Sequence, residues 1–188
     1  MTDSPFQSNL TSHVALLNAL PALEPDIAAV LGLLREALLR GNKILVAGNG
    51  GSAADAQHFT GELVGSFQRN RRALPCLALT VDTSNLTAIG NDFGFDEVFA
   101  RQIEGLGNKG DVFLGLSTSG NSANIIKATE AAHVAGLAVA GLLGRDGGAL
   151  KSLMRETVIV PHMVTARIQE AHIFILHYWA EMLERDCA

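Results

Sequence analysis

"ILVAGNGGSAADAQHF", residues 44–59, is the stretch that decides how this chain folds. An apolar run over residues 44–47 ends in the loop "GNGGS" (48–52), and an alanine-rich helical pattern follows at once. This order predicts a strand that passes into a helix through a loop able to hold an anion, because a helix N-terminus favours negative charge. The glycine spacing matches neither the dinucleotide-binding fingerprint nor the ATP-binding P-loop, so a different ligand is expected.

The composition indicates a globular protein that works in a reducing compartment. The 188 residues are 48% hydrophobic and 18% charged, with a net charge of −5 that weighs against nucleic-acid and anionic-membrane surfaces. The chain has no run of 18 apolar residues and no secretory leader pattern at its N-terminus, so we expect no membrane span and no export. Cys76 and Cys187 lie far apart without a metal or redox motif, which favours a cytoplasmic location.

Strand-like and helical patterns alternate beyond residue 40. Strand-like runs occupy 43–47, 75–80, 111–116, 137–143 and 157–161, and helical patterns occupy 53–66, 95–105, 121–135, 147–154 and 165–184. This alternation predicts an α/β protein, a three-layer αβα sandwich around a doubly wound, five-stranded parallel sheet. Residues 1–40 read as helices broken at Pro21 and Pro25, so we expect one domain over 1–188 with a helical segment, 1–40, before the core, 41–188.

The loop "STSGNS" (117–122) repeats the pattern of a small-residue loop between a strand and a helix. Ser117, Thr118, Ser119 and Ser122 bring four hydroxyls to a helix N-terminus, which suits a phosphate group. The loop has no lysine, which argues against ATP hydrolysis in the P-loop manner. The alternative is that these side chains only cap the helix and tighten a turn.

The loop "GNGGS" contains fewer hydroxyls and should open on the same edge of the sheet. Its glycines allow close approach to a ligand, and Asn49 and Ser52 supply polar side chains, so we expect it to hold a polar body beside the phosphate. The alternative is a glycine-rich turn without a ligand.

His58 and Glu62 follow this loop at i, i+4 spacing and therefore share one face of a helix. An imidazole and a carboxylate beside a sugar or phosphate site are candidates for acid–base chemistry or for metal binding. The alternative is a solvated His–Glu pair on the surface of the helix.

The C-terminal helix carries Gln169, His172 and His177. Gln169 and His177 are about 80° apart around a regular helix and about 12 Å apart along it, which is far for two ligands of one metal ion. The helix could begin late, both side chains could reach inward, or the neighbours could come from different subunits. Asn91 and Asp92, expected in a loop after a short helical stretch, are either turn residues or partners for sugar hydroxyls. His13, His133 and His162 have no partner pattern and are interpreted as surface or structural residues.

The motifs "GNGGSAADAQHF", "GNDFGF", "STSGNSAN" and "ARIQEAH", in this order, resemble the sugar isomerase (SIS) domain and, within it, the phosphoheptose isomerases. The resemblance covers nearly the whole chain. It implies an enzyme that converts D-sedoheptulose 7-phosphate to D-glycero-D-manno-heptose 7-phosphate, the first step of bacterial heptose biosynthesis. It also implies a homotetramer with active sites at subunit interfaces and one zinc ion per subunit.

The resemblance assigns roles to single residues. Glu62 and His177 match the acid–base pair, and the zinc ligands would be His58, Glu62, Gln169 and His177. The substrate would contact Asn49, Gly50, Gly51, Ser52, Glu62, Asn91, Asp92 and Gln169, and its phosphate would lie on Ser117, Thr118, Ser119 and Ser122.

Two positions depart from the family pattern. Ser66 stands where some members have an arginine, and Ala166 where some have an aspartate, so the finer substrate preference stays open. One alternative is therefore an isomerase or sensor of another sugar phosphate. Another is a non-catalytic SIS tetramer that binds the replication initiator DnaA; that group lacks the glutamate and histidine that this chain has as Glu62 and His177, which favours the enzyme.

Overall fold

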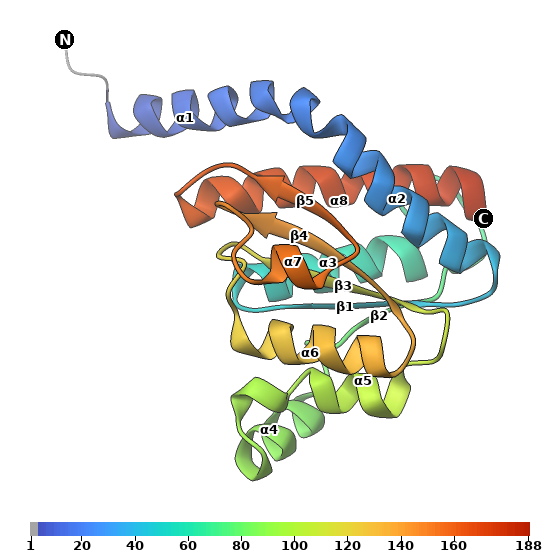
Figure 1. The fold of residues 1–188 in the computed structure, drawn as a ribbon. Coiled ribbons are helices and arrows are strands. Elements are labelled where there is room, and N and C mark those ends of the chain that lie inside the picture. The colour runs from blue at the N-terminus through green and yellow to red at the C-terminus, as the bar shows by residue number, and fades with distance from the viewer. Residues whose placement is uncertain (1–3) are drawn as a thin grey trace.

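The structure is a computed structural model that describes residues 4–188, and its centre is a five-stranded parallel sheet (Figure 1). The strand order is β2-β1-β3-β4-β5, and all four neighbouring pairs are parallel. The strands are β1 (Ile44–Gly48), β2 (Cys76–Ala78), β3 (Val112–Ser117), β4 (Ala138–Gly144) and β5 (Glu156–Val160). Strand order reverses at β1, because β2 pairs with one side of it and β3 with the other.

Side chains of successive strand residues enter two separate cores. Ile44 and Val46 pack into one core, whereas Leu45 and Ala47 pack into the other, as the alternation of side chains along a strand requires. All five residues of β1 are buried, which is the mark of a central strand covered on both faces.

Helices cover both faces of the sheet (Figure 1). The first core is closed by α2 (Glu24–Leu39), α3 (Gly51–Val64) and the long α8 (Thr165–Cys187), whose Trp179 is fully buried and donates to the carbonyl of Ile27. The second core is closed by α5 (Ala100–Leu106), α6 (Ala123–Val134) and α7 (Leu150–Leu153), with α4 (Thr83–Asp92) and the short 3₁₀ turn η2 (Phe95–Glu97) outside them. The predicted αβα sandwich with a five-stranded parallel sheet is confirmed.

The first N-terminal helix lies mostly outside the sheet layers, whereas α2 packs in the first core. α1 (Pro5–Ala19) extends beyond the core and is joined to α2 by the 3₁₀ turn η1 (Leu20–Leu23), so the predicted break at the prolines is confirmed. The stretch Pro5–Leu39 is long enough to cross a membrane and contains an 18-residue window with a mean hydropathy of 1.5, although polar residues interrupt its apolar runs. Length and composition alone are weak evidence, since core helices of soluble proteins pass the same test, and α2 packs in the core.

Several predicted boundaries were wrong. The helix expected over 95–105 is divided into η2 and α5, and the one expected over 147–154 shrinks to α7 because Gly147 and Gly148 adopt positive φ angles. Asn91 and Asp92 lie in the last turn of α4 rather than in a loop. That helix begins at an N-cap, Asp82, whose side chain accepts from the backbone N–H of Asn85.

Candidate active site

The two predicted ligand loops lie side by side at the reversal point of the sheet. β1 leads into α3 through residues 48–51, and β3 leads into α6 through residues 117–122. The carboxyl ends of neighbouring parallel strands lie on one edge, and the point where strand order reverses is where such sheets bind ligands.

The β3 loop gathers hydroxyl groups around a helix N-terminus. The Ser117 hydroxyl lies 3.1 Å from that of Ser122 and 3.5 Å from that of Ser119, and it accepts from the N–H of Gly120. Ser122 is the N-cap residue of α6, yet its side chain makes no capping hydrogen bond. Ser122 therefore does not cap the helix, whereas Ser117 and Ser119 do tighten the turn, because their hydroxyl oxygens accept from the backbone N–H groups of Gly120 and Asn121. The hydroxyls still lie together at a helix N-terminus, where an anion would be favoured.

The β1 loop is tied to the β3 side by a reciprocal amide pair. Asn49 donates to Asn124 at 2.8 Å and accepts from it at 2.9 Å. Asn124, which is buried at the start of α6, was not identified from the sequence because its partner is 75 residues away. This pair occupies the Asn49 side chain, so the loop faces a ligand chiefly with the backbone of Gly50 and Gly51.

Gln169 reaches the same loop from α8. A methyl group placed on Gly51 would stand only 2.3 Å from Nε2 of Gln169, so the amide side chain lies directly against the start of α3. α8 is helical from Thr165 onward, which excludes a late start as the explanation for the Gln169–His177 spacing. The two side chains instead diverge along α8, Gln169 toward the β1 loop and His177 toward the middle of α3.

His58, Glu62 and His177 form a cluster between α3 and α8, which we call the His–Glu–His cluster. Nε2 of His58 lies 2.7 Å from Nε2 of His177 and 3.2 Å from a carboxylate oxygen of Glu62. One nitrogen or oxygen from each residue lies within 4.8 Å of the others. Two imidazoles and a carboxylate are the donor set of many catalytic zinc sites, so the residues present fit a zinc ion.

Asp55 adds a carboxylate one turn before His58 on α3. One of its oxygens is buried without a hydrogen-bond partner, and burial raises the pKa of this carboxyl to about 6 against the opposing effect of His58. Metal-binding histidines commonly donate their second N–H to a carboxylate, but no hydrogen bond joins Asp55 to His58 among residues 4–188, so Asp55 adds negative charge beside the cluster rather than orienting its ring.

Three residues that the sequence did not reveal hold the cluster in place. The ring of Phe67 stacks on that of His177, with centroids 5.7 Å apart. The backbone N–H groups of Phe67 and Gln68 donate hydrogen bonds to the carboxylate of Glu184. Burial raises the pKa of this carboxyl, but the backbone hydrogen bonds and the charge of Arg71 outweigh burial, so the pKa lies below its ordinary value. Arg71 donates to the backbone carbonyl of Glu62 at 2.7 Å and so closes the end of α3.

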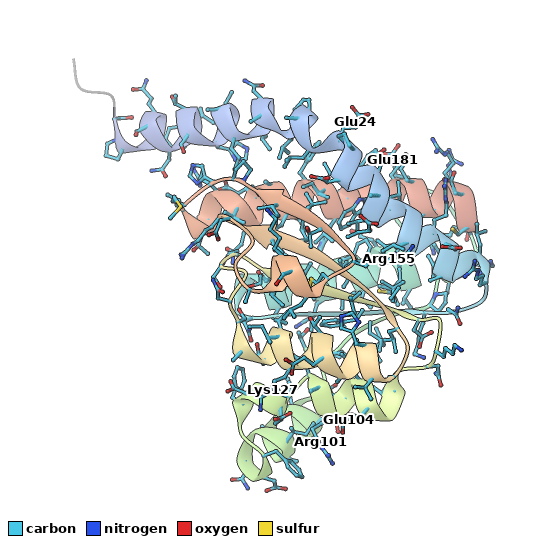
Figure 2. The ribbon with its side chains drawn as sticks, in the orientation of Figure 1. Glu24, Arg101, Glu104, Lys127, Arg155 and Glu181 are labelled. Carbon is cyan, nitrogen blue, oxygen red and sulfur yellow. The ribbon has the colours of Figure 1, made fainter. Side chains whose placement is uncertain are left out.

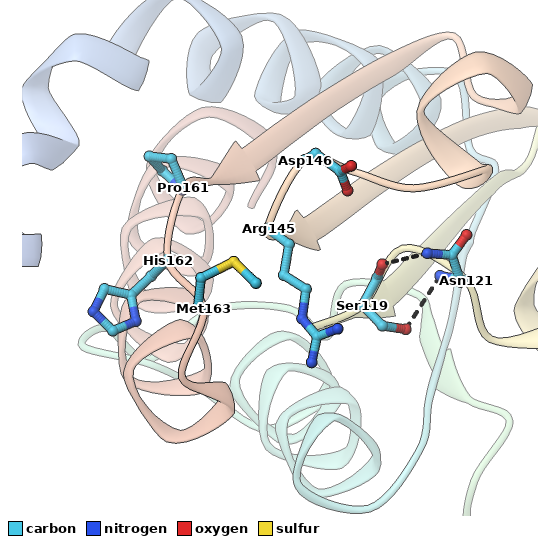
Figure 3. Close-up of a pocket in the computed structure, with 7 residues that line it drawn as sticks. All are labelled: Ser119, Asn121, Arg145, Asp146, Pro161, His162 and Met163. Atoms are coloured by element: carbon cyan, nitrogen blue, oxygen red, sulfur yellow. Dashed lines mark hydrogen bonds between the residues drawn. The ribbon is translucent and has the colours of Figure 1, made fainter.

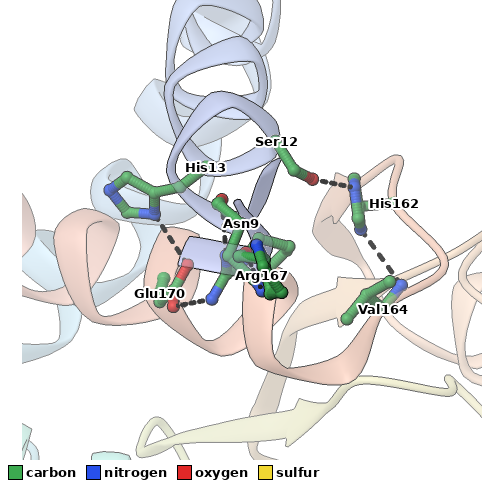
Figure 4. A network of polar contacts seen from close by, with 8 residues as sticks. Asn9, Ser12, His13, His162, Val164, Arg167 and Glu170 are labelled. Carbon is green, nitrogen blue, oxygen red and sulfur yellow. Dashed lines mark hydrogen bonds and ion pairs between the residues drawn. The ribbon is translucent and has the colours of Figure 1, made fainter. Parts of the chain in front are cut away.

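The remaining histidines have structural partners. His172 is fully buried, and its Nε2 lies 3.1 Å from the carbonyl of Leu143. His13 pairs with Glu170, and His162 contacts Ser12, so α1 is bound to the start of α8 (Figure 4). His133 contacts the carbonyl of Leu153. The interpretation of His13, His133 and His162 as surface or structural residues agrees with these contacts.

Comparisons with known proteins identify the family. The model of the SIS domain family matches residues 10–144. A curated phosphoheptose isomerase of Geobacter metallireducens is 54% identical over 181 residues, which span 96% of this chain and 96% of that protein. The chain belongs to the phosphoheptose isomerase family of SIS-domain proteins.

Solved structures of this family agree with the fold. Phosphoheptose isomerase GmhA from Neisseria gonorrhoeae is 44% identical, with a TM-score of 0.86 over 96% of this chain and 99% of that one. A phosphoheptose isomerase from Francisella tularensis is 39% identical, with a TM-score of 0.87 over 96% and 94% of the two chains. The resemblance predicted from the four motifs is confirmed.

Not every residue implied by the phosphoheptose isomerase pattern joins one site within the chain. Asn91 and Asp92 are exposed, and α4 lies across the sheet from α8 (Figure 1). Within residues 4–188, the hydrogen bond between them is the one side-chain interaction that they make. Ser66 and Ala166, the two departures from the pattern, are exposed as well.

Proposed function

We propose that this chain catalyses the isomerisation of D-sedoheptulose 7-phosphate to D-glycero-D-manno-heptose 7-phosphate, the first step of bacterial heptose biosynthesis, in the cytoplasm. The observation that carries the proposal is the convergence of His58, Glu62 and His177 between α3 and α8. A protein that only binds a partner has no need for an acid–base cluster, so the cluster favours an enzyme over the DnaA-binding alternative.

The phosphate and the reacting carbons require separate positions, and the site offers both. The hydroxyls of Ser117, Ser119 and Ser122, together with Thr118, bind the phosphate. His58 lies seven residues beyond Gly51 on α3, about 10 Å along the helix axis. With its phosphate on the β3 loop, an open-chain seven-carbon sugar extends past the β1 loop and along α3 toward the cluster, so phosphate binding supplies the energy that orients the distant carbons.

Glu62 and His177 carry the proton transfers. Glu62 removes a proton from C1 of the ketose, which produces an enediol, and later returns a proton to C2. His177 moves the proton between the oxygens on C1 and C2, and its ring is held for this task between Phe67 and His58. The side-chain amide of Gln169 and the backbone of the β1 loop orient the sugar beside them; the loop residues are Asn49, Gly50, Gly51 and Ser52.

We further propose that His58, Glu62 and His177 hold one zinc ion per subunit, and that Gln169 becomes the fourth ligand by turning its side chain from the β1 loop toward them. When bound, zinc polarises the carbonyl oxygen of the substrate as a Lewis acid. The donor set of the His–Glu–His cluster supports this assignment.

We also propose that the chain is a single domain and assembles as a homotetramer with active sites at subunit interfaces. Exposed apolar side chains on α1 and α8 support an association of copies, because such surface gains from burial: Phe6, Leu10, Val14, Phe174 and Tyr178. In this assembly Asn91 and Asp92, which lie apart from the other site residues of their own chain, contact substrate in a neighbouring copy.

An assay of the purified protein tests the function. With sedoheptulose 7-phosphate, turnover is expected and should increase when zinc is added to metal-stripped protein. Mixed tetramers of Glu62→Gln and Asp92→Ala chains should regain part of the activity if the sites are shared. No turnover, together with tight binding of DnaA, would establish the non-catalytic alternative. Turnover of a different sugar phosphate but not of sedoheptulose 7-phosphate would establish an isomerase of another sugar phosphate.

A further inference from the structure

A cavity of about 510 Å³ adjoins the β3 loop on the side away from β1 (Figure 3). Ser119 and Asn121 line it from the β3 loop, Arg145 from the loop after β4, and His162 from the loop after β5. The size lies within the range of small-molecule sites. The cavity therefore extends the predicted phosphate site toward β4, with a cationic side chain at its wall.

The backbone of Arg145 has an unusual conformation. Its φ angle is 58°, and among residues 4–188 it is the one non-glycine residue with a positive φ. This region is unfavourable for a side chain with a β-carbon, and such strain is found preferentially where a side chain is held for function. A glycine would remove the strain, yet the chain carries an arginine immediately before Asp146, Gly147 and Gly148.

Contacts between the two loops fix this conformation. The N–H of Leu150 donates to the carbonyl of Gly120, and the N–H of Ala149 donates to the side chain of Asn121. Gly120 lies so close to Gly147 that an added β-carbon would stand 2.1 Å from the Gly147 carbonyl oxygen. The β4 loop is therefore locked to the β3 loop, and Arg145 has a fixed place relative to its hydroxyls.

The charge of Arg145 is not used within the chain. Among residues 4–188, its guanidinium forms no hydrogen bond or ion pair, and the neighbouring Asp146 accepts instead from the N–H of Gly148. Two other cations near this edge have partners: Lys127 pairs with Glu97, and Arg167 with Glu170. The β3 loop itself contains no lysine or arginine, and the protein as a whole carries a charge of −5.

We propose that Arg145 binds the phosphate group of the substrate, with its guanidinium on the β4 side of the group and the serine hydroxyls on the β3 side. A phosphate ester carries a charge of about −1.5 to −2 at neutral pH, and guanidinium groups bind such oxygens in pairs of charge-assisted hydrogen bonds. The hydroxyls and the N-terminus of α6 offer only dipoles to this charge, so a full positive charge on Arg145 adds to the binding. The inference rests on the proposed function and adds a residue to the proposed phosphate site.

Three variants test the proposal. Arg145→Gln removes the charge, and Arg145→Gly removes both the charge and the backbone strain. Arg155→Gln is the matched control, because Arg155 is exposed just before β5, at the opposite edge of the sheet (Figure 2). Two measurements apply to each: the dissociation constant of inorganic phosphate, followed by ³¹P NMR, and kcat and KM for sedoheptulose 7-phosphate.

Both Arg145 variants should bind inorganic phosphate at least about tenfold more weakly than the wild type, a loss equal to about 1.4 kcal/mol. The value of kcat/KM should fall by a similar factor, and raised salt should increase KM less than in the wild type. Arg145→Gly should be at least as resistant to heat as the wild type, so a folding defect cannot account for its loss. Arg155→Gln should behave as the wild type does.

Wild-type phosphate binding and KM in both Arg145 variants would overturn the proposal, as would an equal loss in Arg155→Gln. The proposed function fails separately. If the wild type does not turn over sedoheptulose 7-phosphate, while phosphate binding still depends on Arg145, the substrate assignment is wrong and the role of Arg145 in binding phosphate stands.

Discussion

Gly51→Ala is expected to damage catalysis without damaging the fold. Gly51 is the first residue of α3, and its φ angle is not positive, so alanine fits its backbone. The new methyl group, however, would stand 2.3 Å from Nε2 and 2.7 Å from Oε1 of Gln169, whereas ordinary contacts begin at 3.4 Å. The amide of Gln169 must therefore move by about 1 Å.

Gln169 is proposed to orient the substrate, and a displacement of this size at such a group should reduce kcat/KM by about a hundredfold. The cost in stability is small because only the end of a flexible side chain has to move. Gly32→Ala is the matched control: it also adds a methyl group to a helix, α2, but no atom lies within 4 Å of the position. The measurements are steady-state kinetics with sedoheptulose 7-phosphate and thermal unfolding of both variants.

A double-mutant cycle shows whether Gly51→Ala acts through Gln169. Gln169→Ala alone should reduce activity, and adding Gly51→Ala to it should have little further effect, since the displaced group is already gone. Wild-type kcat/KM in Gly51→Ala would refute the reasoning. So would a full, additive loss in the double variant, because the methyl group would then disturb something other than Gln169.

Three further predictions follow from single contacts. Gly120→Ala should destabilise the fold by about 2–5 kcal/mol, because Gly120 has a positive φ and the added methyl group would clash with Gly147. Gly41→Ala is the control: Gly41 also has a positive φ but lies in open space, so this variant should cost only about 1–2 kcal/mol. Urea unfolding measures the stability of both variants. Burial lowers the pKa of His172 to about 4, so protonation favours the unfolded state and up to about 3 kcal/mol of stability should be lost as the pH falls from 6.5 to 4. His172→Gln, which keeps a donor for Leu143 but does not titrate, should lose that dependence, and an unchanged profile would contradict the assignment. A zinc chelator should abolish turnover, and added zinc should restore it. Because His58 belongs to the His–Glu–His cluster, His58→Ala should weaken zinc binding, which calorimetry measures.

The sheet and the two ligand loops were predictable because their signals are local. An apolar run followed at once by glycines or serines and then by a helical pattern defines a strand, a loop and a helix within about 20 residues. Asn91 and Asp92 show the limit of this approach. The N-cap Asp82 marks the start of their helix, but its apolar pattern is short, and no residue of α4 is buried.

The assembly of the active site was not predictable from local patterns. His58 and His177 are 119 residues apart and meet only because α3 packs on α8, and it was family resemblance rather than spacing that paired them. The supports of the cluster depend on similar long-range contacts: Glu184 binds the backbone of Phe67 across 117 residues. A charged residue late in a helix gives no sign in the sequence that it holds a distant loop.

The central claim is that Glu62 is the base of an isomerase, and one comparison tests it most directly. Turnover of sedoheptulose 7-phosphate is measured for the wild type, for Glu62→Gln and for Glu181→Gln, an exposed glutamate on α8 outside the cluster, with the oligomeric state of each determined in parallel. The account predicts that Glu62→Gln lowers kcat by about 10²–10⁴-fold while its assembly and phosphate binding stay unchanged, and that Glu181→Gln behaves as the wild type does. Near wild-type turnover in Glu62→Gln would contradict it.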